Sequence, residues 1–102
     1  MKDFYFTIFN STWTVSFVDA VKTDDEKDFV FGITCGPQNR IEVATKDSAG
    51  NKLPETTVRL TVLHEMIHAI LDEGQYNDAS LDEPMIEWLA NCIYSLKQQN
   101  KL

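Results

Sequence analysis

The chain has 102 residues, of which 43% are hydrophobic and 25% are charged, and its net charge at pH 7 is −7. That length and composition predict a single globular domain over residues 1–102 with a modest hydrophobic core. Because an acidic chain repels phosphate backbones, nucleic acid is excluded as an expected partner.

The sequence has no apolar run as long as a membrane span and no recognisable signal peptide. We therefore expect a soluble, cytoplasmic protein with no membrane partner. Its two cysteines, Cys35 and Cys92, are far apart in sequence and are expected to stay reduced.

The first half of the chain predicts a small sheet, because hydrophobic and polar residues alternate along it with the period of a half-buried strand. Asn10-Ser11 and residues 36–39 have turn chemistry, and the acidic run 24–28 is expected to be a surface turn. Three or four antiparallel strands are expected, at residues 4–9, 12–17, 29–35 and 40–44. The segment 41–44 is a candidate sheet edge for binding an extended peptide.

The second half changes to the three- and four-residue spacing of amphipathic helices. One helix is expected to begin near residues 54–57 and to end at Gly74, and residues 75–80 are expected to be a loop. A second helix is expected to begin near Asp82, with Pro84 tolerated in its first turn. The predicted fold class is therefore α+β, a small antiparallel sheet followed by two helices.

The motif His64-Glu65-Met66-Ile67-His68 lies on the first of these helices and contains both histidines of the chain. Four residues turn a helix by about 400°, so the two imidazole rings project from nearly the same side, one turn apart. That spacing allows two imidazoles to hold one metal ion, and in H-E-x-x-H helices the glutamate serves as general base toward the metal-bound water. The sequence therefore predicts a Zn²⁺ site with His64 and His68 as ligands and Glu65 as the catalytic residue.

A catalytic zinc site needs a third protein ligand, and the chain has no third histidine. Glu83 and Glu87 lie four residues apart on one side of the second helix, which would face the first. Glu87 is the preferred metal ligand, because it lies deeper in the helix and Asn91 could orient it. Glu83, beside Pro84, is left open as an alternative. Asp72 and Glu73 at the end of the first helix are weaker candidates.

The H-E-x-x-H motif followed by Glu87-Trp88-Leu89-Ala90-Asn91 resembles the gluzincin class of zinc metallopeptidases. Within that class the chain is most similar to the small ImmA/IrrE-like and phage-encoded metallopeptidases, which pair an H-E-x-x-H helix with a later helix carrying E-x-x-A-N. The resemblance covers roughly the second half of the chain, and Ile67 departs from the glycine that the family often has before the second histidine.

The resemblance implies a zincin-like fold in which His64, His68 and Glu87 bind zinc and Glu65 activates water. It also implies a peptide or protein substrate whose peptide bonds are hydrolysed. Tyr76 and Tyr94 are candidate donors to the oxyanion that forms in such a reaction.

Two other functions remain open from the residues alone. One is a zinc-binding regulatory or interaction protein with little or no catalytic turnover, in which the metal stabilises a small fold. The other is an adaptor in which the histidine motif binds no metal.

Overall fold

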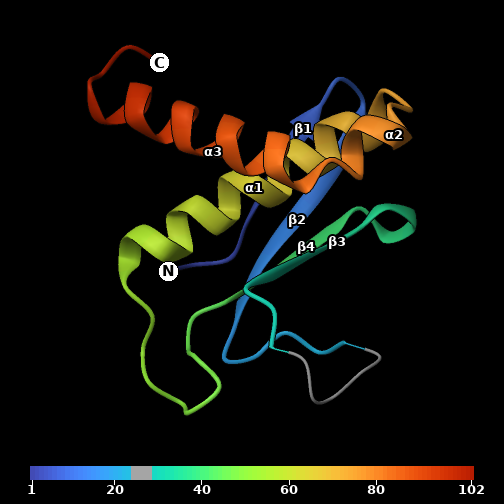
Figure 1. Ribbon diagram of the computed structural model, residues 1–102. Coiled ribbons are helices and arrows are strands. Elements are labelled where there is room, and N and C mark those ends of the chain that lie inside the picture. Colours follow the sequence, from blue (N-terminus) through green and yellow to red (C-terminus); the bar gives the residue numbers. More distant parts are fainter. Residues whose placement is uncertain (24–28) are drawn as a thin grey trace.

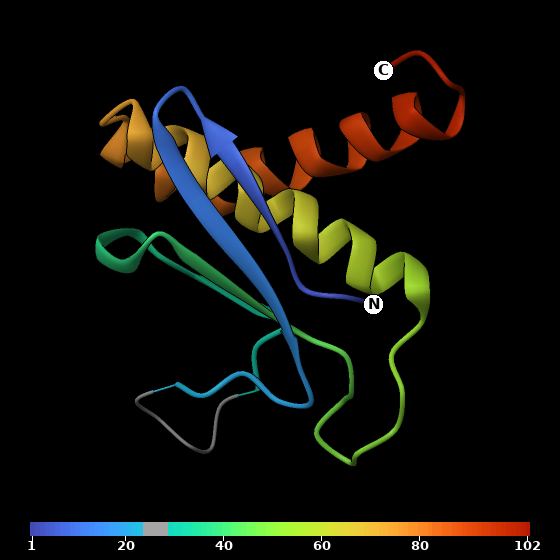
Figure 2. The same cartoon turned by 180° about the vertical axis from the view of Figure 1, so that it is seen from behind.

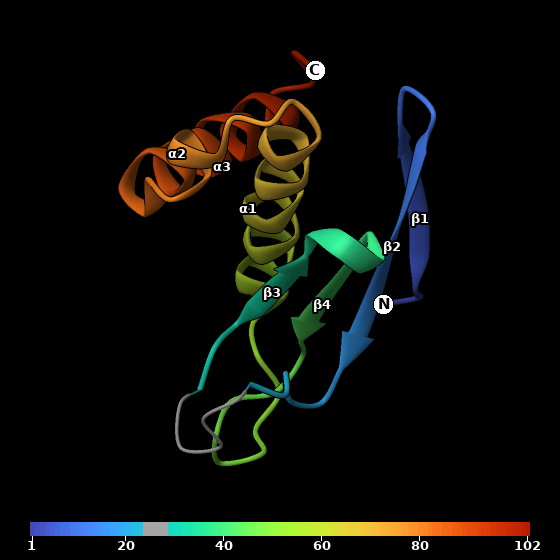
Figure 3. The same cartoon turned by 90° about the vertical axis from the view of Figure 1, so that its right-hand side faces the viewer.

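The computed structural model describes residues 1–23 and 29–102, and it shows a four-stranded sheet with three helices on one side of it (Figure 1). The side view shows the helical layer facing the sheet (Figure 3). This arrangement confirms the α+β class. The acidic run 24–28, which was expected to form a surface turn, lies outside the described residues.

The strands are β1 (Phe4–Ile8), β2 (Ser11–Val18), β3 (Gly32–Cys35) and β4 (Arg40–Ala44). Their order in the sheet is β1-β2-β4-β3, and β2 pairs with β4 in parallel. The expectation of a wholly antiparallel sheet is therefore wrong. The turn between β1 and β2 lies at Phe9-Asn10 and not at Asn10-Ser11, because Ser11 already pairs with Ile8.

The burial of the side chains of β4 and β3 agrees with their positions, β4 inside the sheet and β3 at its edge. Ile41, Val43 and Ala44 of β4 are fully buried, whereas every residue of β3 is only half-buried. The candidate edge at residues 41–44 is therefore wrong, because β4 is paired on both sides. The free edge belongs to β3, which is also shorter than expected, since residues 29–31 are outside the strand.

The long helix α1 (Glu55–Glu73) packs across the sheet, as the view from behind shows (Figure 2). Val58 and Ala69 of α1 join a core with residues of β2 and β4, namely Trp13, Val15, Ile41 and Val43. The helix ends where the sequence predicts. The left-handed residue there is Gln75, with φ 61°. A Cβ at Gly74 would lie 2.7 Å from the Tyr76 ring, so a side chain at this position would displace that exposed ring.

Two further helices cover α1 on the side away from the sheet. The expected loop at residues 75–80 contains a short helix, α2 (Asn77–Ser80). Helix α3 (Glu83–Gln98) begins near Asp82, as predicted; Asp82 is its N-cap, and its carboxylate accepts a hydrogen bond from the Met85 N–H at 3.2 Å. Ile86 and Ala90 of α3 are fully buried against Ile67 of α1. Among the described residues, no helix has both the length and the apolar character that crossing a membrane requires.

Gly32 sets how closely α1 approaches the edge strand. A Cβ at this position would lie 2.8 Å from the Thr61 methyl group and 3.0 Å from the Glu65 Cγ. Distances of this size are shorter than normal carbon–carbon contacts, so any side chain here would push the helix away from β3. The absence of a side chain at Gly32 therefore fixes where Glu65 lies.

Replacing Gly32 with alanine is expected to lower the free energy of unfolding by about 1–3 kcal/mol, the usual cost of overpacking a core. The matched control is Gly36→Ala, where the new Cβ would meet only the Asp72 Oδ2 at an ordinary 3.7 Å. Urea denaturation of both variants measures the difference. Equal stabilities would contradict this account of the packing between β3 and α1.

Candidate metal centre

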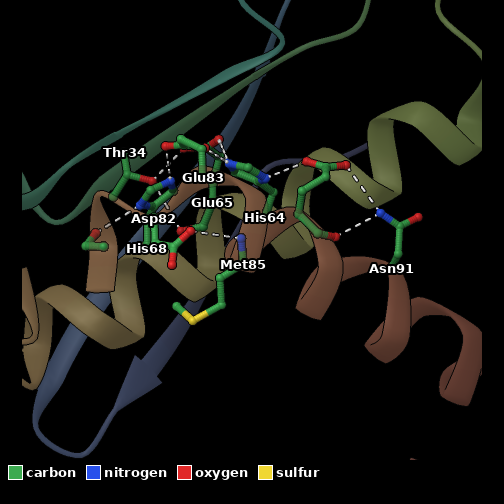
Figure 4. Close-up of polar contacts among 10 residues, drawn as sticks. Thr34, His64, Glu65, His68, Asp82, Glu83, Met85 and Asn91 are labelled. Carbon is green, nitrogen blue, oxygen red and sulfur yellow. Dashed lines mark hydrogen bonds and ion pairs between the residues drawn. The ribbon is translucent and has the colours of Figure 1, made fainter. Parts of the chain in front are cut away.

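The two histidines lie side by side on α1 and face the beginning of α3 (Figure 4). Their ring centroids are 5.1 Å apart, as expected for imidazoles one helical turn apart. Both side chains are mostly buried, with 16% of the His64 and 13% of the His68 side chain exposed. The structure thus places His64 and His68 together, with both rings held at the boundary between the helical core and the cleft.

Glu83 joins the two rings. Its Oε2 lies 2.8 Å from His64 Nε2, and its Oε1 lies 3.0 Å from His68 Nε2. One ligand atom from each of these three residues lies within 4.8 Å of the other two. Among the described residues, these three form the group that could hold a metal ion, because one ion at their centre could contact all three.

Glu87, which the sequence favours as the third ligand, lies on the other side of the His64 ring. Its Oε2 is 2.8 Å from His64 Nδ1, so the two glutamates contact opposite ring nitrogens. Asn91 donates from its side-chain amide to the Glu87 carbonyl oxygen at 2.8 Å and to Oε1 at 3.3 Å. The expected contact between Asn91 and Glu87 is therefore present. The assignment of Glu87 as a metal ligand stays a prediction.

The contacts of His64 place one imidazole ring between two carboxylates, each at 2.8 Å from a ring nitrogen. A carboxylate only accepts hydrogen bonds, and a neutral imidazole has a single N–H, so only one of the two carboxylates can accept from the ring. If the N–H is Nδ1, the lone pair of Nε2 faces the Glu83 carboxylate, which is repulsive. A cation between Nε2 and the Glu83 carboxylate would remove this repulsion. The donor set therefore fits a divalent metal ion at this point.

Ser80 supports His68 in a similar way. The Oγ of this buried serine lies 2.9 Å from His68 Nδ1, which leaves Nε2 directed toward Glu83. A hydrogen bond to the second nitrogen of a ligating histidine fixes the ring orientation and the tautomer. The sequence contained no signal for this contact, because Ser80 lies in a segment that was expected to be a loop.

Glu65 lies beneath the histidines and against the edge strand. The residue is only 7% exposed, and its Oε2 is 4.0 Å from His64 Nε2. The Thr34 hydroxyl of β3 donates to Glu65 Oε1 at 2.8 Å. Thr34 is a second residue that the sequence did not identify, because pairing of β3 beside α1 is a long-range contact.

Burial raises the pKa of the Glu65 carboxyl above its ordinary value, because desolvation disfavours the charged form. The hydrogen bond from Thr34 and the charges of the two histidines act in the opposite direction, and the negative charge of Glu83 adds to the rise. A carboxyl with a raised pKa holds a proton more readily than a surface glutamate does. That property suits a group that accepts and returns a proton near neutral pH.

A cleft of about 970 Å³ opens over these residues. One wall is β3 with the preceding residues 29–31, and the other walls are α1, α2 and the first turns of α3. Neither tyrosine considered as an oxyanion donor lines this cleft: Tyr94 lines a separate groove and Tyr76 is exposed beside Gly74. Cys35 and Cys92 are also absent from its walls, and both are free thiols.

The weaker ligand candidates, Asp72 and Glu73, have different surroundings. Glu73 points to the hairpin, where its carboxylate accepts hydrogen bonds from Ser11 Oγ at 3.0 Å and from Trp13 Nε1 at 2.8 Å. Asp72 lines the cleft, one helical turn beyond His68. Neither belongs to the group of residues that could hold a metal ion.

Comparisons of the chain with models of protein families, with curated proteins and with solved structures returned no match. The interpretation of this site therefore rests on the geometry and chemistry of its own residues.

Burial of the Glu65 carboxylate predicts a pH-dependent effect of Glu65→Gln on the metal-free protein. Because the folded-state pKa is raised, ionised Glu65 destabilises the fold at pH values above that pKa, and the penalty disappears below the unfolded value near 4.5. In chelator, Glu65→Gln should therefore melt at a higher temperature than the parent at pH 8, with a smaller difference at pH 4.

The control for the loss of one negative charge is Asp78→Asn, because Asp78 is exposed on α2. This variant should melt like the parent at both pH values. A Glu65→Gln protein that is no more stable than the parent at pH 8 would show that the buried carboxylate carries no desolvation penalty.

Proposed function

We propose that the protein is a zinc-dependent peptidase whose metal is held by His64, His68 and Glu83. Glu87, the ligand that the sequence favours, would instead hold the His64 ring through Nδ1. Two imidazoles and a carboxylate form a ligand set typical of catalytic zinc. The observation that carries the proposal is the position of the Glu83 carboxylate, which faces the Nε2 atoms of both histidines at 2.8 and 3.0 Å.

The position of Glu65 favours a catalytic role for the site over simple metal storage. A zinc ion in this site would act as a Lewis acid and lower the pKa of a bound water. Glu65 is not in the group of potential ligands, yet its Oε2 lies 4.0 Å from His64 Nε2. Held at its other oxygen by Thr34, it is free to accept a proton from water in the cleft and to return it to a leaving amine.

The edge of β3 supports a peptide as the substrate. Phe31 O accepts a hydrogen bond from Ala44 N at 2.8 Å, so in the antiparallel ladder the alternate residues Gly32 and Thr34 direct their N–H and C=O groups away from β4. β3 is an edge strand of the sheet, and Gly32, Ile33 and Thr34 line the cleft. An extended peptide could pair with this edge and bring a peptide bond to the residues on α1.

A zinc-binding protein without turnover is the second candidate function. The cluster joins α1 to α3, and the buried core between these helices is small, with Ile67, Ile86 and Ala90 as its buried members. A metal ion there would also stabilise the domain, because it would bind only the folded chain tightly. The two candidates differ in whether Glu65 matters for function.

The metal site is tested by zinc content and affinity in the parent protein and in four variants, His64→Ala, His68→Ala, Glu83→Gln and Glu87→Gln. We expect one zinc per chain in the parent and loss of zinc from both histidine variants and from Glu83→Gln. The variant Glu87→Gln should keep zinc with about 10- to 100-fold weaker affinity, the usual effect of losing a partner behind a ligand. Zinc lost from Glu87→Gln and kept by Glu83→Gln would reverse the two roles.

Turnover is tested by comparing the zinc-loaded parent with zinc-loaded Glu65→Gln on a mixture of unstructured peptides. A general base contributes about 10²- to 10⁴-fold, so the variant should lose at least a hundredfold in cleavage rate while its zinc content stays the same. Mass spectrometry of the products measures the rate. Cleavage that is unchanged in the variant would rule out Glu65 as the base, and absence of cleavage by the zinc-loaded parent would favour the candidate without turnover.

A further inference from the structure

We infer that the cleft selects peptides that carry a cationic group, which Asp72 binds at one end while an apolar side chain occupies the other end. This inference rests on the proposed peptide substrate and specifies its class. It makes Asp72 a specificity-determining residue, outside the group of potential metal ligands.

Asp72 is placed to contact a peptide that lies over the histidines. His64, His68 and Asp72 are spaced four residues apart on α1, so their side chains share one face of the helix. Asp72 lines the cleft together with Asn77 and Ser80 of α2. A Cβ at Gly36, the residue after β3, would lie 3.7 Å from Asp72 Oδ2, so this carboxylate lies near the end of β3.

The Asp72 carboxylate differs from its neighbours on α1 in having no partner in the described part of the chain. It is half-buried, and within residues 1–23 and 29–102 its side chain makes no hydrogen bond or ion pair. The adjacent Glu73 provides a contrast, because its carboxylate accepts two hydrogen bonds from β2. A partly desolvated carboxylate without a partner binds a cation more strongly than a fully exposed one does, because water screens it less.

The negative charge of the cleft also favours a cationic ligand. The cleft is lined by four carboxylates, from Glu65, Asp72, Glu83 and Glu87, and by no lysine or arginine of the described chain. A divalent metal would offset charge at the histidines, but Asp72 lies six residues beyond the midpoint of His64 and His68. At 1.5 Å per residue this is about 9 Å along the helix, so its charge stays available to a ligand.

The other end of the cleft is apolar. Phe29 and Phe31 line it, with their rings in edge-to-face contact at 5.0 Å and with 38% and 46% of each residue exposed. Leu60 of α1 also lines the cleft. Aromatic rings that remain partly exposed on a cleft wall can bury an apolar side chain of a ligand.

The direction of the peptide follows from the strand edge. β3 runs from the end of the cleft at Phe31 toward Gly36 and Asp72. Antiparallel pairing is the more stable arrangement, and it places the amino-terminal part of the peptide at Asp72. Since an extended residue spans about 3.3 Å, the 9 Å offset puts the cation two or three residues before the scissile bond.

The test is equilibrium binding of short peptides to zinc-loaded Glu65→Gln, in which turnover does not interfere. The peptides consist of alanine and serine with one phenylalanine, and they carry lysine, glutamine or glutamate three positions before it. Each peptide is used with a free or an acetylated amino terminus, which separates recognition of a side-chain cation from recognition of a terminal ammonium.

We expect the lysine or free-amine peptides to bind about tenfold more tightly than their neutral counterparts, the size of one charge-assisted hydrogen bond. Adding Asp72→Asn should remove most of this preference, and Asp72→Lys should reverse it toward glutamate. The control Asp78→Asn removes an equal charge at an exposed position of α2 and should leave the preference intact.

A preference for cations that survives Asp72→Asn, or peptides that bind without any preference, would overturn the inference. Zinc-loaded protein that binds none of the peptides would also overturn the inference, but it would leave the proposed metal site unaffected. A parent protein that takes up no zinc would instead mark failure of the proposed function, so the two failures are distinguishable.

Discussion

The site depends on one electrostatic constraint, which is that His64 is held between two carboxylates. Glu87 contacts Nδ1 and Glu83 contacts Nε2, each at 2.8 Å, and a carboxylate can only accept. A neutral imidazole has one N–H for these two acceptors, so one carboxylate faces a nitrogen lone pair, and added positive charge would stabilise the arrangement. Because Glu83 also faces His68 Nε2, a divalent ion at the centre would neutralise the repulsion and would contact all three residues.

The fold positions these groups through two close approaches. The absence of a side chain at Gly32 lets α1 lie against β3, which brings Glu65 within hydrogen-bonding distance of Thr34. The small, fully buried Ala90 lets α3 lie against α1, which places both glutamates of α3 beside the histidines. Elements from both halves of the chain therefore meet at the site, and the short helix α2 adds a hydrogen bond to His68.

Sequence periodicity was sufficient for features that depend on neighbours along the chain. It identified the strands at residues 12–17 and 40–44, both long helices, and the histidine pair, because all of these repeat at helix or strand spacing. It was insufficient for the parallel pairing of β2 with β4 and for the contact from Thr34, which join distant segments. The choice between Glu83 and Glu87 depends on the rotation of α3 against α1, and a shared helical face leaves that rotation open.

A metal ion in this site would be held by His64, His68 and Glu83. The most direct measurement is X-ray absorption at the zinc edge of the zinc-loaded protein, compared with Glu83→Gln. We expect nitrogen and oxygen neighbours at about 2.0–2.2 Å with the scattering pattern of two imidazoles, and a changed set of nearest neighbours in the variant. A spectrum with sulfur neighbours at about 2.3 Å, or one without imidazole scattering, would contradict this ligand set.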